Sequence, residues 1–399
     1  MRYGHLMPRR SPLPGLNRNV VLLGCTSFLN DISSEIIYPL LPTFLAVVLG
    51  SSPTYIGLIE GVADSTASLL KLLSGWLSDR LARRKGLVVA GYAIAAVSRP
   101  LVAIATAPWH VLLIRFTDRT GKGLRSAPRD ALLTESVAST AWGRAFGFHR
   151  AMDHLGAVIG PLIAFMLVSG LGEGYRVVFA LASVPGMLAL PVLVFGVHER
   201  AQYRTAKVAP KPVWQKPSPP LRNFLAALLL FTLGNSTDAF LLLRARNLGI
   251  SVAALPLLWS LLHVTKSASS IPGSGLSDRL GRKWVIVLGW GVYALVYLGF
   301  GCANSAIEIW ILFALYGLFF GLTEGTERAL IADLSPTRRG VTFGYYHLII
   351  GTASLPASVI FGALWSWGGP ALAFTVGAGL AGSAALLLVL LVPQGQQKS

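Results

Sequence analysis

The amino-acid sequence predicts an all-α polytopic membrane protein with twelve transmembrane helices arranged as two six-helix repeats. Of its 399 residues, 53% are hydrophobic and 13% are charged, whereas soluble domains average about 45–50% apolar and about 25% charged residues. Apolar stretches of about 20 residues, the length that crosses a bilayer, recur along the whole chain. A short charged motif also occurs twice, in corresponding positions of the two halves.

The apolar stretches set the expected helices and the domain organisation. We expect helices near residues 20–49, 54–77, 86–106, 108–133, 143–169, 174–196, 222–247, 252–276, 284–303, 306–333, 340–367 and 370–392. The predicted parts of the chain are an N-terminal tail (1–19), a six-helix bundle (20–196), a linker (197–221), a second six-helix bundle (222–392) and a C-terminal tail (393–399). The N-terminal tail holds four arginines but no apolar run, so we do not expect it to be a signal peptide.

The Lys and Arg residues are concentrated in alternate loops, which sets the orientation of the helices. The loops after the second, sixth, eighth and tenth helices are basic, whereas residues 50–53, 107, 304–305 and 368–369 contain neither Lys nor Arg. By the positive-inside rule, both chain ends are expected to be cytoplasmic. The net charge of +17 then reflects membrane topology, and we expect no nucleic-acid partner.

A basic motif follows the second helix of each half. Residues 75–85 read Gly-Trp-Leu-Ser-Asp-Arg-Leu-Ala-Arg-Arg-Lys, and residues 275–283 read Gly-Leu-Ser-Asp-Arg-Leu-Gly-Arg-Lys. Asp79 and Asp278 are 199 positions apart, about half the length of the chain. A duplicated unit of membrane helices is the repeat organisation of a secondary transporter.

This motif resembles the signature of the loop between helices 2 and 3 in the major facilitator superfamily. The matching residues are Gly75, Asp79, Arg80 and Arg83 in the first half and Gly275, Asp278, Arg279 and Arg282 in the second. The resemblance implies a major facilitator fold and alternating access, in which Asp79 and Asp278 contribute to a gate that holds the halves together. The alternative is ordinary cytoplasmic positive charge with an incidental acid.

A glycine pattern in the fifth helix resembles the antiporter signature of the superfamily's drug:proton exchangers. It comprises Gly147, Gly156, Gly160 and Pro161, but the usual trailing glycines are absent. The resemblance implies export by antiport. Alternatively, these glycines simply allow close packing of membrane helices.

Ionisable residues inside membrane helices are costly and are therefore candidates for function. The candidates for proton coupling or for a substrate cavity are Asp31, Glu35, Asp64, Arg115, Asp118, Arg119, Lys122, Arg150, Asp153, Asp238 and His263. The charged residues of the fourth helix fall on one side of it, within an arc of roughly 140°. Such a stripe on a spanning helix must face protein or water.

The basic stripe of the fourth helix has two interpretations. The helix interiors of the first half contain six acids and six bases, so mutual ion pairing can account for much of the stripe. A substrate with an anionic group is the other interpretation, because Arg115, Arg119 and Lys122 share one face.

Proton coupling requires an acid whose environment changes during transport. Asp31, Glu35 and Asp64 are the first choices because they lie near mid-depth in the first two helices. A permanent salt bridge is the alternative for each of them. Acids and histidines of the first half could also ligate a divalent metal, but basic neighbours would repel it, and we expect no resident metal or cofactor.

The sequence therefore favours a secondary active transporter that exports a small organic molecule in exchange for protons. Nothing indicates an enzyme, and the chain has no Gly-x4-Gly-Lys-Ser/Thr loop for ATP-driven transport. The alternatives are a proton-coupled symporter that imports an organic anion, a divalent metal transporter, and a non-transporting scaffold or sensor. We expect a monomer in a bacterial inner membrane, with lipid, protons and a small-molecule substrate as partners.

Overall fold

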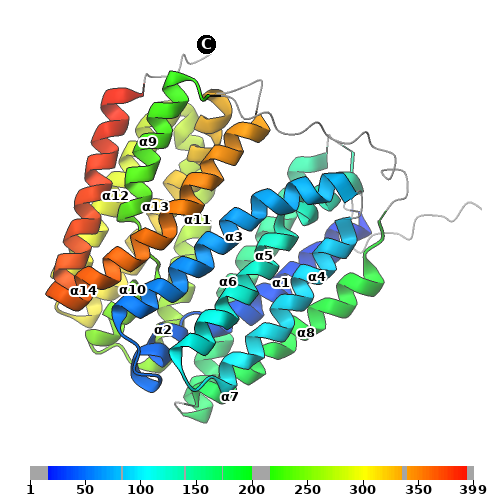
Figure 1. The fold of residues 1–399 in the computed structure, drawn as a ribbon, viewed down its shortest axis with the longest axis horizontal. Coiled ribbons are helices and arrows are strands. Elements are labelled where there is room, and N and C mark those ends of the chain that lie inside the picture. Colours follow the sequence, from blue (N-terminus) through cyan, green and yellow to red (C-terminus); the bar gives the residue numbers. More distant parts are fainter. Residues whose placement is uncertain are drawn as a thin grey trace, which may run out of the picture.

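The computed structural model describes residues 17–81, 84–138, 141–172, 174–199, 216–334 and 339–392. Every regular element in these ranges is a helix. We call the described residues up to 199 the N-terminal half and those from 216 onward the C-terminal half. Figure 1 shows the helices of the N-terminal half, coloured blue to green, beside those of the C-terminal half, coloured green to red.

The helical segments of the N-terminal half begin and end close to the predicted positions. The elements are α1 (Arg18–Ile37), α2 (Leu41–Thr43), η1 (Phe44–Val48), α3 (Pro53–Leu81), α4 (Arg84–Ser98), η2 (Arg99–Ile104), α5 (Pro108–Ser136), α6 (Trp142–Leu171), α7 (Tyr175–Leu181), α8 (Ser183–Pro191) and η4 (Val192–Gly196). Two of the interruptions coincide with prolines, Pro39 after α1 and Pro100 at the start of η2. Proline cannot donate the backbone hydrogen bond that would continue an α-helix.

The C-terminal half is organised in the same way. Its elements are α9 (Pro219–Gly234), α10 (Ala239–Asn247), η6 (Val252–Ala254), α11 (Leu255–Leu280), α12 (Arg282–Cys302), α13 (Ala306–Leu334) and α14 (Arg339–Leu391). α14 consists of two helices that meet at Gly369, where φ is 78°. This left-handed backbone conformation is readily accessible only to glycine, so Gly369 marks the turn between the last two predicted helices.

Eight helical stretches of the described chain are long and apolar enough to cross a membrane. The last, Thr342–Leu391, is 50 residues long and contains both helices that meet at Gly369. The helices α3, α5 and α11 are long enough but do not meet the criterion of apolar composition. They carry charged residues such as Asp64, Arg119 and Lys266. Together these segments correspond to the predicted apolar stretches.

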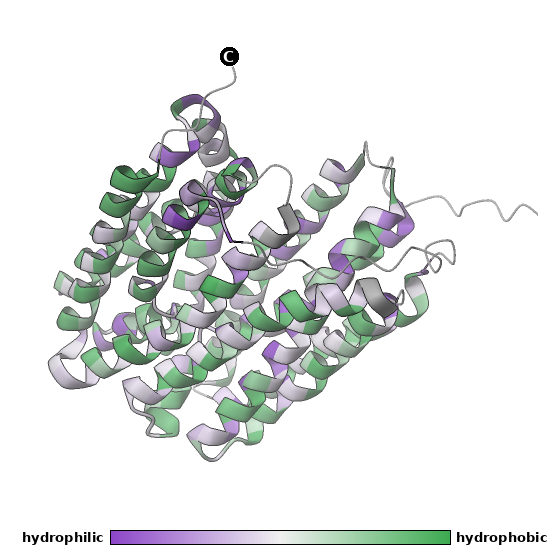
Figure 2. Ribbon diagram, turned by 45° about the horizontal axis from the view of Figure 1, so that its top comes forward, coloured by the Kyte–Doolittle hydropathy of each residue, from purple (hydrophilic) through white to green (hydrophobic). Residues whose placement is uncertain are grey.

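Large apolar side chains cover much of the outer surface. Ile104, Phe195, Ile271 and Leu295 each expose 70% or more of their surface. Figure 2 shows hydrophobic residues along most of the length of the helices. A soluble monomer rarely exposes so much apolar surface, whereas the hydrocarbon core of a bilayer accommodates it.

α3 and α14 lie side by side across the boundary between the halves, as Figure 1 shows. A Cβ atom added at Gly61 of α3 would lie 3.0 Å from a backbone Cα atom of α14, and one added at Gly362 of α14 would lie 2.8 Å from a Cα atom of α3. Gly57 and Gly351 are also in close contact with the opposite helix. We call the contact formed by these four residues the glycine seam, because it lets the two backbones approach closely.

Candidate functional site

A cavity of about 460 Å³ lies between the two halves. Residues of α1, α3 and α5 line it from the N-terminal half, and residues of α9, α11, α13 and α14 line it from the C-terminal half. The lining includes six of the residues predicted for the site: Glu35, Asp64, Arg119, Lys122, Asp238 and His263. Four further charged residues that we did not predict for the site also line it: Lys266, Glu324, Glu327 and Arg328.

Glu35 of α1 contacts α11 of the opposite half. The indole Nε1 of Trp259 donates a 2.7 Å hydrogen bond to Oε2 of Glu35. The same oxygen lies 3.9 Å from Nε2 of His263, and neither ring nitrogen of His263 hydrogen-bonds to a described residue. The Trp259 ring packs against Tyr38, with ring centroids 4.8 Å apart. The surroundings of this carboxylate therefore combine groups from both halves.

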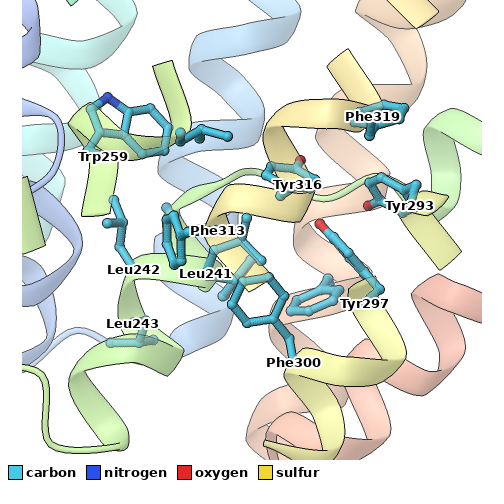
Figure 3. Close-up of a cluster of buried hydrophobic side chains, with 14 of the residues drawn as sticks. Leu241, Leu242, Leu243, Trp259, Tyr293, Tyr297, Phe300, Phe313, Tyr316 and Phe319 are labelled. Atoms are coloured by element: carbon cyan, nitrogen blue, oxygen red, sulfur yellow. The ribbon is translucent and has the colours of Figure 1, made fainter. Parts of the chain in front are cut away.

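Two acids of the C-terminal half accept hydrogen bonds from neutral donors. The hydroxyl of Tyr316 donates to Asp238 at 2.7 Å. Glu327 accepts from the indole of Trp290 at 3.0 Å and from the hydroxyl of Tyr346 at 3.1 Å. Tyr316 belongs to the cluster of buried hydrophobic side chains shown in Figure 3.

The cationic residues of the C-terminal lining share one acid. Nζ of Lys266 lies 3.2 Å from one oxygen of Glu324, and Nη2 of Arg328 lies 3.1 Å from the other. Lys266 also lies over the ring of Phe320, 4.2 Å from its centroid. These two cations are therefore partly neutralised within their own half.

Some charged residues of α5 form ion pairs with residues of other helices in the N-terminal half. Nε of Arg115 donates to Glu60 of α3 at 2.9 Å, and the two side chains form a second hydrogen bond through Nη2 and Oε2. Nε of Arg99 donates to Asp118 at 2.9 Å. All four side chains are buried. Arg115 and Asp118, both predicted for the site, thus form ion pairs and do not line the cavity.

Arg119 and Lys122 face the cavity without such partners. Neither side chain forms an ion pair or a hydrogen bond with another residue that the structure describes. The Nε atom of Arg119 is buried and has no hydrogen-bond acceptor. Asp64 of α3 lines the same cavity, and its carboxylate also lacks a partner among the described residues.

Asp31, Arg150 and Asp153 lie outside the cavity lining. Asp31 accepts a 2.9 Å hydrogen bond from the neighbouring Asn30. Asp153 lies 3.4 Å from Nδ1 of His149 and 3.9 Å from Nη1 of Arg150 on the same helix.

The glycines of the predicted antiporter motif differ in their contacts. A Cβ atom at Gly156 would lie 2.8 Å from the carbonyl oxygen of Phe28, and one at Gly160 would lie 2.9 Å from the Cβ of Glu35. A Cβ atom at Gly147 would meet nothing within 4 Å. Pro161 is buried inside α6. Gly156 and Gly160 therefore let α6 approach the part of α1 that bears Glu35, as the packing interpretation requires.

The predicted gate motif is described only in part. The side chains of Asp79 and Arg80 and the whole of Arg83 lie outside the described residues. Gly75 is in ordinary contact with α5.

The second copy of the motif lies at the exposed end of α11. Gly275, Asp278 and Arg279 are exposed. Arg282, at the start of α12, donates a 2.6 Å hydrogen bond to the carbonyl of Ala329 and forms an ion pair with Asp333. This arginine therefore connects α12 to α13 within the C-terminal half.

A hydrogen bond joins the halves near the loop between η1 and α3. The hydroxyls of Thr54 and Ser366 are 3.0 Å apart. A second contact between the halves lies at the cavity, where the hydroxyl of Tyr38 is 3.5 Å from that of Thr237. The positive-inside rule predicts that the loop between η1 and α3 lies on the outer side of the membrane.

Several lining residues were not predicted from the sequence. The sequence could have identified three of them as candidates, since Lys266, Glu324 and Glu327 are each an ionisable residue inside an apolar stretch. Trp259 carried no such signal, because a tryptophan in a membrane helix more commonly packs in the core or at the interface. Among the described residues, no group of three or more His, Cys, Asp or Glu side chains could hold a metal ion.

The membrane-length helices, and a charged cavity shared between two halves, define a polytopic α-helical transporter. Consistent with this class, the family model of the Major Facilitator Superfamily matches residues 23–244 and 223–399. The chain belongs to the major facilitator superfamily, a family of transporters rather than enzymes.

Three known proteins illustrate the similarity. An uncharacterised transporter of this superfamily from Methanocaldococcus jannaschii is 35% identical over 383 residues, 94% of this chain and 95% of that protein. The fosmidomycin resistance protein of Escherichia coli is 26% identical over 362 residues, 85% of each chain. A crystal structure of the nucleoside transporter NupG superposes with a TM-score of 0.76 at 14% identity, covering 94% of this chain and 99% of that one.

Proposed function

We propose that this transporter exports a small organic molecule in exchange for protons, by alternating access. The observation that carries the proposal is the position of Glu35, a cavity carboxylate on α1 that accepts a hydrogen bond from Trp259 and lies 3.9 Å from His263, both on α11 of the opposite half. We infer that the two predicted six-helix bundles move against each other around this cavity.

Coupling follows from the dependence of a carboxylate on its partners. The affinity of an acid for a proton is set by the charges, hydrogen bonds and solvent around it. If α1 and α11 separate as the halves move, Glu35 loses the Trp259 N–H and exchanges it for water. A change of partners between the two forms of the transporter is the requirement for exchanging a proton against a substrate.

The outward direction is supported by a relative and by the motif in α6. One relative is named a resistance protein, and a transporter protects a cell from a toxic compound by exporting it. The spacing of Gly147, Gly156 and Gly160 resembles the antiporter signature. We further propose that the chain works as a monomer in the inner membrane with both ends in the cytoplasm, as its Lys and Arg distribution indicates.

Proton movement in proteoliposomes tests this proposal. Vesicles holding the purified protein and a pH-sensitive dye are given a pH gradient, and a panel of organic anions, cations and neutral compounds is added. We expect at least one compound to dissipate the gradient and to move opposite to the protons. Glu35→Gln should abolish the proton signal for that compound. Glu308→Gln is the matched control, since Glu308 is a solvent-exposed acid near the outer end of α13 that hydrogen-bonds to Asn304.

Two results would contradict the proposal. A compound that equilibrates without moving protons would make the protein a uniporter, and Glu35 a structural residue. A compound that moves in the same direction as the protons would establish symport. Symport of an organic anion is the second candidate function, favoured by the unpaired Arg119 and Lys122 in the cavity.

A further inference from the structure

We infer that the substrate is an amphiphilic organic anion, and that Arg119 and Lys122 of α5 bind its anionic group. This inference rests on the proposed transport function, since it names the class of molecule that enters the same cavity. The substrate would combine one carboxylate, sulfonate or similar group with an apolar, ring-containing body.

The charges of α5 separate into two groups. Arg115, Asp118 and Arg129 each form an ion pair with a protein side chain, and Arg125 lies over the ring of Tyr92 at 4.5 Å. Arg119 and Lys122 do neither, and these are the two α5 residues that line the cavity. Internal ion pairing therefore accounts for part of the predicted basic stripe. It does not account for Arg119 and Lys122, the part of the stripe that faces the cavity.

An unpaired cation inside a membrane protein is costly. Such charges are retained where a ligand neutralises them during function. The Nε atom of Arg119 is buried and has no hydrogen-bond acceptor among the described residues, whereas Lys122 is exposed to the cavity. A guanidinium and an ammonium three positions apart on one helix can both donate to one anionic group.

None of the five acids that line the cavity forms an ion pair with Arg119 or Lys122. Glu324 lies between Lys266 and Arg328, and Glu35, Asp238 and Glu327 already accept hydrogen bonds from Trp or Tyr side chains. Asp64 is the remaining lining acid and has no partner among the described residues. Arg119, Lys122 and Asp64 are therefore the charged lining residues without a hydrogen bond or ion pair to another described residue.

The opposite wall of the cavity fits an apolar body. Phe231, Phe319, Phe320 and Trp259 line the cavity from the C-terminal half, and Tyr38 lines it from the N-terminal half. Phe319 and Trp259 belong to the cluster of buried hydrophobic side chains shown in Figure 3. The cavity volume of about 460 Å³ falls within the range of about 300–1,000 Å³ typical of small-molecule sites. An aromatic wall facing a pair of cations selects a molecule with an anionic end and a ring.

Calorimetric titration of the purified protein in detergent tests the inference without a proton gradient. The probes share one ring system and differ in charge: naphthalene-2-sulfonate, the neutral naphthalene-2-sulfonamide and 2-naphthylmethylammonium. We expect the sulfonate to bind most tightly and its affinity to fall as ionic strength rises. Arg119→Gln and Lys122→Gln should each weaken sulfonate binding about tenfold or more, as expected for loss of a charge-assisted hydrogen bond.

Matched variants control for folding and for general charge effects. Lys71→Gln removes a lysine from membrane helix α3 that does not line the cavity, and it should leave sulfonate binding unchanged. Lys122→Arg keeps the charge and should bind the sulfonate nearly as well as the wild type. Thermal unfolding of each variant, followed by size-exclusion chromatography, verifies that weakened binding does not reflect loss of the fold.

The inference is wrong if the sulfonate binds no more tightly than the other two probes, if none of the three binds, or if the glutamine variants bind it as the wild type does. These results are independent of proton coupling. A cation that exchanges with protons in vesicles would overturn the anion site while the proposed antiport stands. A sulfonate that binds through Arg119 and Lys122 but moves no protons would retain the site and overturn the coupling.

Discussion

Glu60 and Arg115 lie 55 positions apart in the chain and share two hydrogen bonds in the interior of the N-terminal half. Their residues expose only 2% and 7% of their surfaces. Desolvating two charges is expensive, so a buried pair adds little net stability, but removing one partner leaves the other charge uncompensated. The pair is therefore best tested by comparing single and double substitutions.

We predict that Glu60→Gln destabilises the protein by about 3–5 kcal/mol, because Arg115 is then buried without a carboxylate. The double variant Glu60→Gln/Arg115→Gln should lose less stability than the sum of the two single variants. Reversible unfolding in mixed micelles measures these differences. Simple additivity of the two substitutions would show that the side chains do not interact as the structure indicates.

Trp259 connects the halves at the level of the proposed proton site. Trp259→Phe removes the N–H that donates to Glu35 but keeps a ring against Tyr38. We predict a lower number of protons moved per substrate molecule, with little change in thermal stability. Trp367→Phe is the control, since Trp367 is 84% exposed on the outer surface. An unchanged proton-to-substrate ratio for Trp259→Phe would show that Trp259 has no role in proton coupling.

At the scale of the helix, α6 contains its own set of controls. Gly156→Ala and Gly160→Ala would place a Cβ within 3 Å of α1 atoms, whereas Gly147→Ala would meet nothing. We predict that the first two substitutions lower the unfolding temperature and the transport rate by displacing α1. Gly147→Ala should be neutral or slightly stabilising, by up to about 1 kcal/mol, because alanine is the better helix former. Equal effects at all three positions would argue against the packing explanation.

Helix positions and the charged face of α5 could be predicted from the sequence because both depend on local periodicity. The sequence could not predict which acid pairs with which base. Arg115 has Asp118 three positions away on its own helix, yet it pairs with Glu60 of α3, while Asp118 pairs with Arg99. These choices are made by the packing of helices against one another, which no local pattern in the chain records.

For the whole molecule, Thr54 and Ser366 mark a place where the halves meet at the predicted outer side. Their hydroxyls are 3.0 Å apart, so cysteines at these positions are close enough to test as a disulfide. In a background lacking Cys25 and Cys302, which are free thiols, we predict that oxidation of Thr54→Cys/Ser366→Cys stops transport. Reductant should restore transport, and each single-cysteine variant should be insensitive to oxidant. Continued transport by the cross-linked protein would show that the halves need not separate here.

The cavity could be predicted in part because its residues come from a repeat that the sequence displays. Asp64 and His263 are 199 positions apart, as are Asp79 and Asp278, and the first two line the same space. Trp259 and Tyr38 could not be assigned to the cavity, because an aromatic side chain carries the same apolar signal in the core and at a ligand site. Only the three-dimensional arrangement distinguishes the two.

The glycine seam between α3 and α14 has a mechanical consequence. Most helix pairs interlock through ridges and grooves of side chains, and a change of crossing angle must disengage them. At Gly57, Gly61 and Gly362 the contact is largely with the backbone of the opposite helix, whereas Gly351 meets the side chains of Ser68 and Leu69. One helix can therefore roll on the other while few side-chain contacts are lost. The seam is therefore suited to be the axis of the proposed rotation of the halves, because a contact with few interlocking side chains resists a change of crossing angle less.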